Sequence, residues 1–351
     1  MLLSRLAVVL LVLPVAVPLS LTPVQAASFD CSKAATPFEH AICDMPELSA
    51  ADDLLAKSFA TASGGLTREG LTALRADQKN WLTYAQRACT DDAKPLTTGR
   101  YDEDSSACLV EKFSARSDAL EQSRMISRHR FYVQGIYGAE PDPNEVDNPD
   151  SYWKVGAHEL VYPVLDADSP LADAFNDYVS ARVDGLAQIV VDPDRGDEFD
   201  PTIDSDVTVK VDEIAGANRI TLLATSYWYG HGAAHGNSII RRLNYYVPED
   251  REIVAEDIFA GEDWASTLVD VAWAQLQAQH KDWLQVESAG DIAEAVVDPT
   301  RWDLSNDYGL VIQFQPYEVA AYAYGAPTIT VPWDQLAEIQ ADTQESIRFG
   351  Y

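Results

Sequence analysis

Two histidines, His231 and His235, lie four residues apart in the stretch 227–237, which also carries three aromatic residues and three glycines. A spacing of four places two side chains on one face of a helix, where they can bind one metal ion. Glycine, however, disfavours a helix by about 1 kcal/mol per residue. We therefore predict a loop at this position and no metal site.

Such a loop has two other roles open to it. Its imidazoles can hydrogen-bond the loop backbone and hold the turn together. Alternatively, the loop contacts a partner protein, because aromatic side chains on exposed loops are frequent hot spots. On this second reading the partner-binding residues are Trp228, Tyr229, His231 and His235.

The rest of the chain carries no pattern typical of catalysis. GxSxG, P-loop, CxxC and HExxH motifs are all absent. The acidic run 192–198 resembles a calcium loop but lacks the oxygen ligand at the fifth position and the glutamate at the twelfth. We predict that the protein is not an enzyme and uses no cofactor.

The stretch 227–237 needs strands on both sides to position it. Apolar runs at 220–224 and 239–247 meet that need. Further strands are predicted at 155–165, 207–211, 310–314 and 328–331. Helices are predicted at 170–190, 264–280 and 332–339. Strands dominate and helices are interspersed, so residues 151–351 are predicted to form an α+β domain with a mostly antiparallel sheet.

Residues 27–125 are instead predicted to form a small all-α helical bundle. Helices are predicted at 36–42, 46–63, from 67 onward and at 106–122. The polar loop predicted at 91–105 is an equal candidate for the contact with a partner. The chain's four cysteines, Cys31, Cys43, Cys89 and Cys108, all lie in this region, which predicts a disulfide-stapled domain. The sequence-local pairs Cys31–Cys43 and Cys89–Cys108 are favoured. Cys43 and Cys89 flank a predicted helical hairpin, and their pairing remains an alternative.

The first 26 residues predict an export signal. Arg5 precedes an apolar run, and Val24-Gln25-Ala26 offers small residues at a cleavage site. The mature protein is then periplasmic or secreted, with no membrane span after signal removal. Residues 126–150 hold three prolines and several acids near their end, and are predicted to form an extended, solvated linker.

The balance of charge limits the partners. With 25 Lys and Arg against 56 Asp and Glu, the net charge is −31. A nucleic-acid binder needs a basic face, so nucleic acid is excluded as a partner. A cell-envelope protein with a neutral or cationic partner is expected.

The order of residues in the first domain carries a resemblance. Its landmarks are the four cysteines, the run from Gln78 through Trp81-Leu82 to Arg87, and Arg116 with Leu120. This order resembles the small exported, DUF1311-like domain of the LprI family of lysozyme inhibitors. The resemblance implies lysozyme binding.

The second domain is similar to the DUF3298 family. The landmarks are residues 229–236, the strand at 310–314, Tyr317-Glu318-Val319-Ala320 and Val331-Pro332. The family is known from the extracellular part of the RsiV anti-sigma factor, a lysozyme receptor. It also occurs as an accessory domain of peptidoglycan deacetylases, which implies no catalysis here.

Both resemblances point to one partner. They imply a protein that binds a cationic muramidase, a lysozyme, and inhibits it by occluding its glycan cleft. The alternative is a module that binds peptidoglycan or an envelope protein without inhibiting anything.

Overall fold

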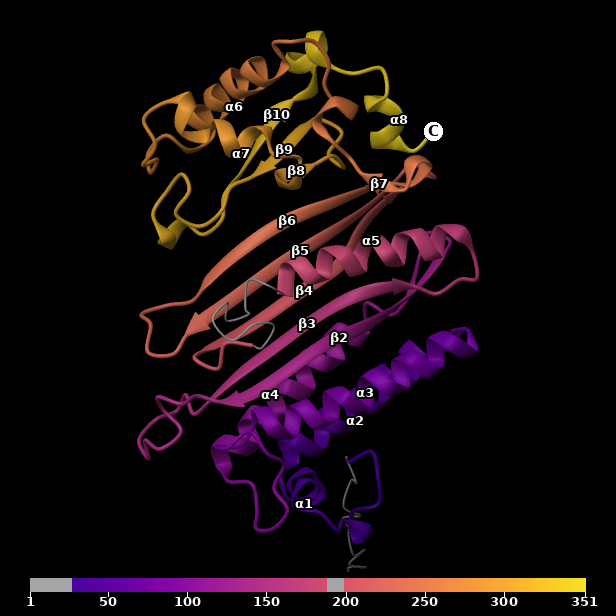
Figure 1. Cartoon of the computed structure of the whole chain (residues 1–351), viewed down its shortest axis with the longest axis vertical. Coiled ribbons are helices and arrows are strands. Elements are labelled where there is room, and N and C mark those ends of the chain that lie inside the picture. The colour runs from indigo at the N-terminus through magenta and orange to yellow at the C-terminus, as the bar shows by residue number, and fades with distance from the viewer. Residues whose placement is uncertain (1–26, 188–198) are drawn as a thin grey trace, which may run out of the picture.

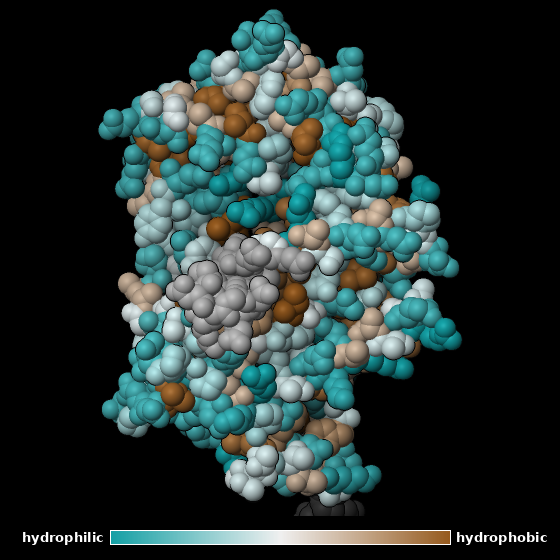
Figure 2. All heavy atoms as spheres, in the orientation of Figure 1, coloured by the Kyte–Doolittle hydropathy of each residue, from teal (hydrophilic) through white to brown (hydrophobic). Residues whose placement is uncertain are grey.

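The computed structural model describes residues 27–187 and 199–351, and their elements stack in three tiers (Figure 1). A helical unit lies at one end, a long twisted sheet in the middle, and a smaller α+β unit with the C-terminus at the other end. The predicted signal, the calcium-like run 192–198 and the end of the helix predicted to reach residue 190 lie outside the described residues. The face seen in Figure 2 is mostly hydrophilic with small hydrophobic patches, as the high content of acids leads one to expect.

The helical unit confirms the predicted all-α region. A 3-10 turn and four helices follow one another: η1 (Cys31–Lys33), α1 (Pro37–Asp44), α2 (Pro46–Ser63), α3 (Arg68–Ala88) and α4 (Glu103–Leu120). Prolines begin α1 and α2, where a missing N–H costs nothing. The helix α4 begins three residues earlier than predicted, because the Asp102 side chain accepts a hydrogen bond from the Ser105 backbone N–H at 2.8 Å and caps it.

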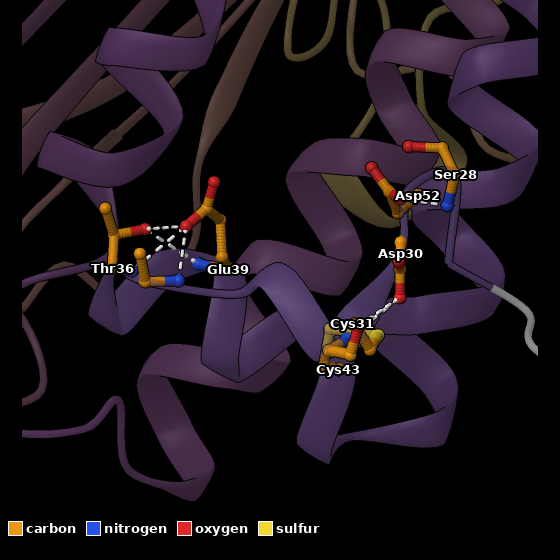
Figure 3. The surroundings of a disulfide bond; sticks show 9 residues. Ser28, Asp30, Cys31, Thr36, Glu39, Cys43 and Asp52 are labelled. Atoms are coloured by element: carbon orange, nitrogen blue, oxygen red, sulfur yellow. Dashed lines mark hydrogen bonds between the residues drawn. A yellow bond between two sulfur atoms is a disulfide. The ribbon is translucent and has the colours of Figure 1, made fainter.

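Two disulfides close this unit in the sequence-local pairing, Cys31–Cys43 and Cys89–Cys108. The first fastens η1 to α1, beside a capping box in which Thr36 and Glu39 bond each other's backbone (Figure 3). The second closes the loop between α3 and α4. Crosslinks over loops of this length contribute about 3 kcal/mol each, mainly by restricting the unfolded chain.

The central sheet has seven strands in sequence order, from β1 to β7. Their bounds are β1 (Met125–Ile126), β2 (His129–Pro141), β3 (Val155–Leu165), β4 (Ile203–Ala215), β5 (Arg219–Gly230), β6 (Asn237–Tyr246) and β7 (Arg251–Glu252). All neighbours pair antiparallel except β3 and β4, which are parallel. The helix α5 (Pro170–Ala187) makes the crossover between them.

The strand β2 differs from the prediction of a solvated linker. It pairs with β3 over most of its length, from Phe131↔Leu165 to Pro141↔Val155. Phe131, Tyr132 and Val133 near its start are all buried, and the three prolines begin only at Pro141. Composition near residues 140–149 was therefore a poor guide to residues 129–140.

Both faces of β2 and β3 are covered. On one face Val133, Ala139 and Val161 share a core with Trp81 and Phe113 of the helical unit. On the other face a second core joins the sheet to α5. The helical unit is thus packed directly onto the sheet.

The third tier follows β7 and has its own core, which includes Leu268, Trp302 and Phe314. Its elements are η3 (Val247–Glu249), just before β7, then η4 (Ala255–Asp257), α6 (Trp264–His280), η5 (Ala289–Ile292), α7 (Ala293–Val297), η6 (Pro299–Arg301), β8 (Trp302–Asp303), β9 (Gly309–Gln313), η7 (Tyr322–Tyr324), β10 (Thr328–Pro332), η8 (Trp333–Ile339) and α8 (Gln344–Phe349). A three-stranded antiparallel sheet runs β10-β9-β8. The segment predicted as a final α-helix is the 3-10 helix η8.

This tier is fastened to the edge of the large sheet. The Gln315 side chain receives a hydrogen bond from the Ile240 backbone N–H and donates one to the Ile240 carbonyl, at 2.8 and 2.7 Å. Gln315 therefore substitutes for a neighbouring strand beside β6 and fixes the tier against it.

Candidate functional site

The residues predicted to contact a partner lie where β5 turns into β6. The two strands pair as far as Trp228↔Asn237, and the connection between them contains Gly232 at φ +78°. That conformation is open to glycine at little cost. We call residues 227–237 the hairpin tip.

His231 is nearly enclosed, with 4% of its side chain exposed. Its Nδ1 lies 2.6 Å from Asp142 Oδ2, and its Nε2 lies 3.6 Å from Asp204 Oδ2. Burial alone would lower the pKa of His231, but the two carboxylates outweigh it and raise the pKa above 6.5. His231 therefore ties the hairpin tip to the end of β2, and its side chain has almost no surface to offer a partner.

His235 lies on the outside of the hairpin tip. Its Nδ1 donates to the Gly236 carbonyl at 2.9 Å, so in the neutral ring Nε2 accepts from the Tyr317 hydroxyl at 3.0 Å. The ring stacks on Tyr322, with centroids 4.0 Å apart and planes at 20°. The Tyr322 hydroxyl donates to the Gly236 carbonyl as well, at 2.8 Å. These contacts join the hairpin tip to residues 315–324, which we call the tyrosine turn.

Tyr317 is held in an unusual backbone conformation. It has φ +69° in a tight turn closed by the Glu318 N–H on the Gln315 carbonyl at 3.1 Å, with Pro316 before it. Glycine is the residue that usually occupies this position of a turn. The residue here is instead a tyrosine, and it is 54% exposed. Strain of this kind is often found where a side chain is needed for contact.

Residues 142–154, between β2 and β3, connect the hairpin tip to the helical unit; we call them the bridging loop. The Trp153 ring lies 6.1 Å from the ring of Tyr229. The Lys154 Nζ lies 2.6 Å from Asp91 Oδ2, in the loop between α3 and α4. Tyr152, beside them, is 87% exposed. Figure 1 shows the bridging loop, the hairpin tip and the 91–105 loop on the same side of the molecule.

An acidic groove lies between the bridging loop and the helical unit, with a volume of about 600 Å³. Asp91, Asp102, Asp104 and Asp150 line it, and Lys154 is the one basic residue of its lining. The Ser105 backbone N–H lowers the pKa of Asp102 through its hydrogen bond, so this carboxylate is charged at neutral pH. The groove therefore suits a positively charged side chain of a partner.

Four segments thus form one composite surface: the 91–105 loop, the bridging loop, the hairpin tip and the tyrosine turn. Of the predicted residues, Tyr229 and His235 belong to it. His231 lies beneath it, and Trp228 points to the opposite face of β5 from Tyr229, because strand side chains alternate. Sequence reasoning missed Tyr152, Tyr317 and Tyr322. The adjacent aromatics Tyr152-Trp153, within a run of acids, were the available signal for the first.

Among residues 27–187 and 199–351, no three His, Cys, Asp or Glu side chains are placed to hold a metal ion. Across the same residues, every helix is too short or too polar to cross a bilayer.

The architecture defines a class: a disulfide-stapled helical unit joined to an α+β unit. Comparison with protein families makes this specific. Residues 31–120 match the family model "Lysozyme inhibitor LprI", and residues 256–334 match "Protein of unknown function (DUF3298)". Both predicted resemblances are confirmed in their order along the chain. The second match begins after the hairpin tip, so the strands β2 to β6 lie outside both matched segments.

Two solved structures of DUF3298 proteins are similar to this chain at a low level. One, from Pseudomonas aeruginosa PAO1, has 15% identity and a TM-score of 0.42, covering 60% of this chain and 95% of that one. The other, from Bacteroides fragilis NCTC 9343, has 16% identity and a TM-score of 0.42, covering 63% and 96%. No curated protein sequence matches the chain significantly.

Proposed function

We propose that this protein binds lysozyme and inhibits it through the composite surface. The match of residues 31–120 to the lysozyme inhibitor family is the observation that carries the proposal. The acidic groove lies between that matched unit and the bridging loop, and the bridging loop contacts the hairpin tip through Trp153 and Tyr229. The two regions that the sequence left as rival contact sites are therefore neighbours.

The proposed mechanism is occlusion, with no chemical step. Lysozyme cleaves glycans between two carboxyl groups in an open cleft, and a side chain placed in that cleft keeps the glycan out. Tyr152 is the most exposed aromatic residue among those described and projects from a loop. Tyr317 and His235 supply a second contact. The aspartates of the groove attract a cationic muramidase and pair with its basic side chains.

The proposal includes a periplasmic or secreted location for the mature protein. Disulfides form and persist in oxidising compartments outside the cytoplasm. Both disulfides of the helical unit suit such a compartment, and the apolar leader predicted at residues 1–26 supplies the route.

A lytic assay tests the inhibition. Purified mature protein is titrated into a cationic lysozyme acting on bacterial cell walls, while the fall in turbidity is followed. We expect lysis to stop at a few-fold molar excess of inhibitor. Full lysis at that excess, together with no binding of lysozyme in solution, would refute the proposal.

A point variant tests the hairpin tip. His235→Ala removes the ring that stacks on Tyr322 and accepts from Tyr317, and we expect lysozyme binding to weaken about ten-fold. His129→Ala, at the far end of β2, is the matched control and should bind as the wild type does. Unchanged circular dichroism must accompany the loss. Unfolding of His235→Ala would instead assign the ring a structural role.

Truncation near residue 140 is a poor way to divide the activity between the two halves. The helical unit shares its core with Val133, Ala139 and Val161 of the sheet, so cutting there exposes apolar surface. Variants in the full chain avoid this. Tyr152→Ala and Tyr317→Ala report on the bridging loop and the tyrosine turn separately.

A second candidate function is binding of peptidoglycan or another glycan without inhibition. The exposed ring of Tyr317 next to Tyr322 and His235 favours it, because sugars stack on aromatic faces whose edges carry hydrogen-bonding groups. A pull-down on insoluble peptidoglycan separates the two functions. Suppose that peptidoglycan captures the wild-type protein but not Tyr317→Ala, and that the wild type leaves lysozyme active. This result would favour glycan binding over lysozyme inhibition.

A further inference from the structure

A second cavity lies at the end of the sheet opposite the hairpin tip. The β1–β2 turn, the β4–β5 turn and the start of α5 meet there, next to the C-terminal segment (Figure 1). The cavity has a volume of about 730 Å³. Pockets for small organic ligands span about 300–1,000 Å³.

The walls of this cavity are apolar. Leu171 of α5, Ile214 and Ile220 of β4 and β5, and Val247 line it. Gly216 (φ +51°) packs against the carbonyl of Gly350 so closely that a Cβ would collide with it. The C-terminal segment and the β4–β5 turn therefore close one side, and they leave an apolar interior with little room to shift.

The charge around the cavity is the reverse of the charge of the chain. The protein has 56 acids and 25 Lys and Arg, yet no acid is among the residues that line this cavity. Arg128 and His129 stand in the lining instead. A carboxylate or phosphate would meet positive charge here and apolar walls behind it.

Arg128 is free to receive such a group. Its neighbour Arg130 donates to the Ala62 and Gly64 carbonyls at 2.6 and 2.9 Å and so is committed to the fold. Arg128, by contrast, is exposed and makes no hydrogen bond or ion pair with any residue in 27–187 or 199–351. The turn before it includes Ser127 at φ +55°, a conformation that is costly for serine.

We propose that this cavity binds a single-chain anionic amphiphile. The acidic head would pair with the Arg128 guanidinium at the mouth, and the alkyl chain would lie against Leu171, Ile220 and Val247. The site is independent of the lysozyme contact, since it occupies the other end of the sheet.

Calorimetry with the full-length mature protein tests the proposal, with dodecanoate as the probe below its micelle concentration. We expect dodecanoate to bind at least about five-fold more tightly than dodecanol, and acetate not to bind, because both the charge and the chain contribute. Arg128→Ala should remove the preference for dodecanoate over dodecanol. Arg75→Ala, which removes an exposed arginine of α3, is the matched control and should keep that preference.

A second variant tests the place of binding. Ala217→Trp puts an indole into the cavity from an exposed turn position, and should abolish dodecanoate binding while the protein keeps its circular dichroism spectrum and lysozyme binding. Equal affinity for dodecanol and dodecanoate would overturn the proposal. So would full affinity in Ala217→Trp, or binding seen only with anionic lipid vesicles.

Discussion

At the scale of residues, the contacts of His231 with Asp142 and Asp204 stabilise the fold by an amount that depends on pH. Its pKa is raised above 6.5 in the folded protein, where Asp142 and Asp204 hold the charged ring. A raised pKa contributes stability that is complete below about pH 6.5 and is lost as pH rises through the folded value. Thermal melting from pH 5 to 9 should therefore show a larger deficit of His231→Gln against wild type at pH 5 than at pH 9. A constant deficit across that range would contradict this role.

Tyr317 has a strained backbone, and a pair of variants tests whether its ring contacts a partner. Replacing it with glycine or alanine removes the same ring, but only glycine relieves φ +69°. We expect Tyr317→Gly to be more stable than Tyr317→Ala by about 1 kcal/mol in urea unfolding. Both should bind lysozyme equally weakly. If the alanine variant is as stable as the glycine variant, the backbone at this turn carries no strain.

From the sequence, the role of a single residue could be predicted only where its contacts are close along the chain. The members of each cysteine pair are close in the sequence, and the structure confirms both pairs. The enclosure of His231 depends on Asp142, 89 positions away, and on Asp204. No pattern around residue 231 encodes that contact, so the sequence left a structural role and a partner contact both open.

At the scale of elements, a buried polar network joins α3 and α4 to the sheet. Arg116 of α4 pairs with Asp77 of α3 at 2.5 Å and also donates to the hydroxyl of Tyr137 on β2 at 2.9 Å. Asp77 in turn accepts from the Gly135 backbone N–H at 2.8 Å. Charged groups that are buried and paired in this way fix the position of one element against another.

Glu159 of β3 lies next to this network, and its burial raises its pKa from 4.5 to about 7, although Lys112 opposes the shift. The folded protein then binds this proton more tightly than the unfolded chain, so stability falls as pH rises from about 4.5 to 7. Glu159→Gln should match wild type at pH 4 and exceed it at pH 8 by roughly 1–3 kcal/mol. Urea midpoints at the two pH values measure this. A variant that is less stable than wild type at pH 8 would show that the charged carboxylate is needed.

Periodicity predicted the elements well where it was strong and local. The helix at 264–280 and the strand at 155–165 have the bounds expected from their apolar patterns. The strand β2 was missed because its partner β3 covers the very residues that a linker would expose, and pairing is not visible in one strand's composition. The helix predicted at 332–339 forms the 3-10 helix η8 (Trp333–Ile339), which is a smaller difference.

At the scale of the whole molecule, the composite surface could not be predicted from the sequence. Its four segments are spread over more than 200 positions, from 91 to 324. They meet because β2 and β5 both end on the side of the molecule where the loop between α3 and α4 lies. Such non-local pairing leaves no trace in local composition. The sequence could identify the acidic balance and the two contributing regions, but not their adjacency.

That adjacency predicts how lysozyme binding depends on salt. If the aspartates of the groove steer a cationic partner, the association rate should fall several-fold between 50 and 500 mM NaCl. Asp102→Asn combined with Asp104→Asn should lower the rate at 50 mM and have little effect at 500 mM. Asparagine caps a helix as well as aspartate does, so α4 should persist.

The matched control removes the same two charges from the far end of the sheet, as Asp173→Asn with Asp177→Asn on exposed positions of α5. The net charge changes equally in the two double variants, so any difference between them reports on place and not on total charge. We expect the control to change the association rate, measured by stopped flow, less than two-fold. Equal losses in both double variants would mean that the overall charge of −31 attracts lysozyme and that the groove makes no specific contact.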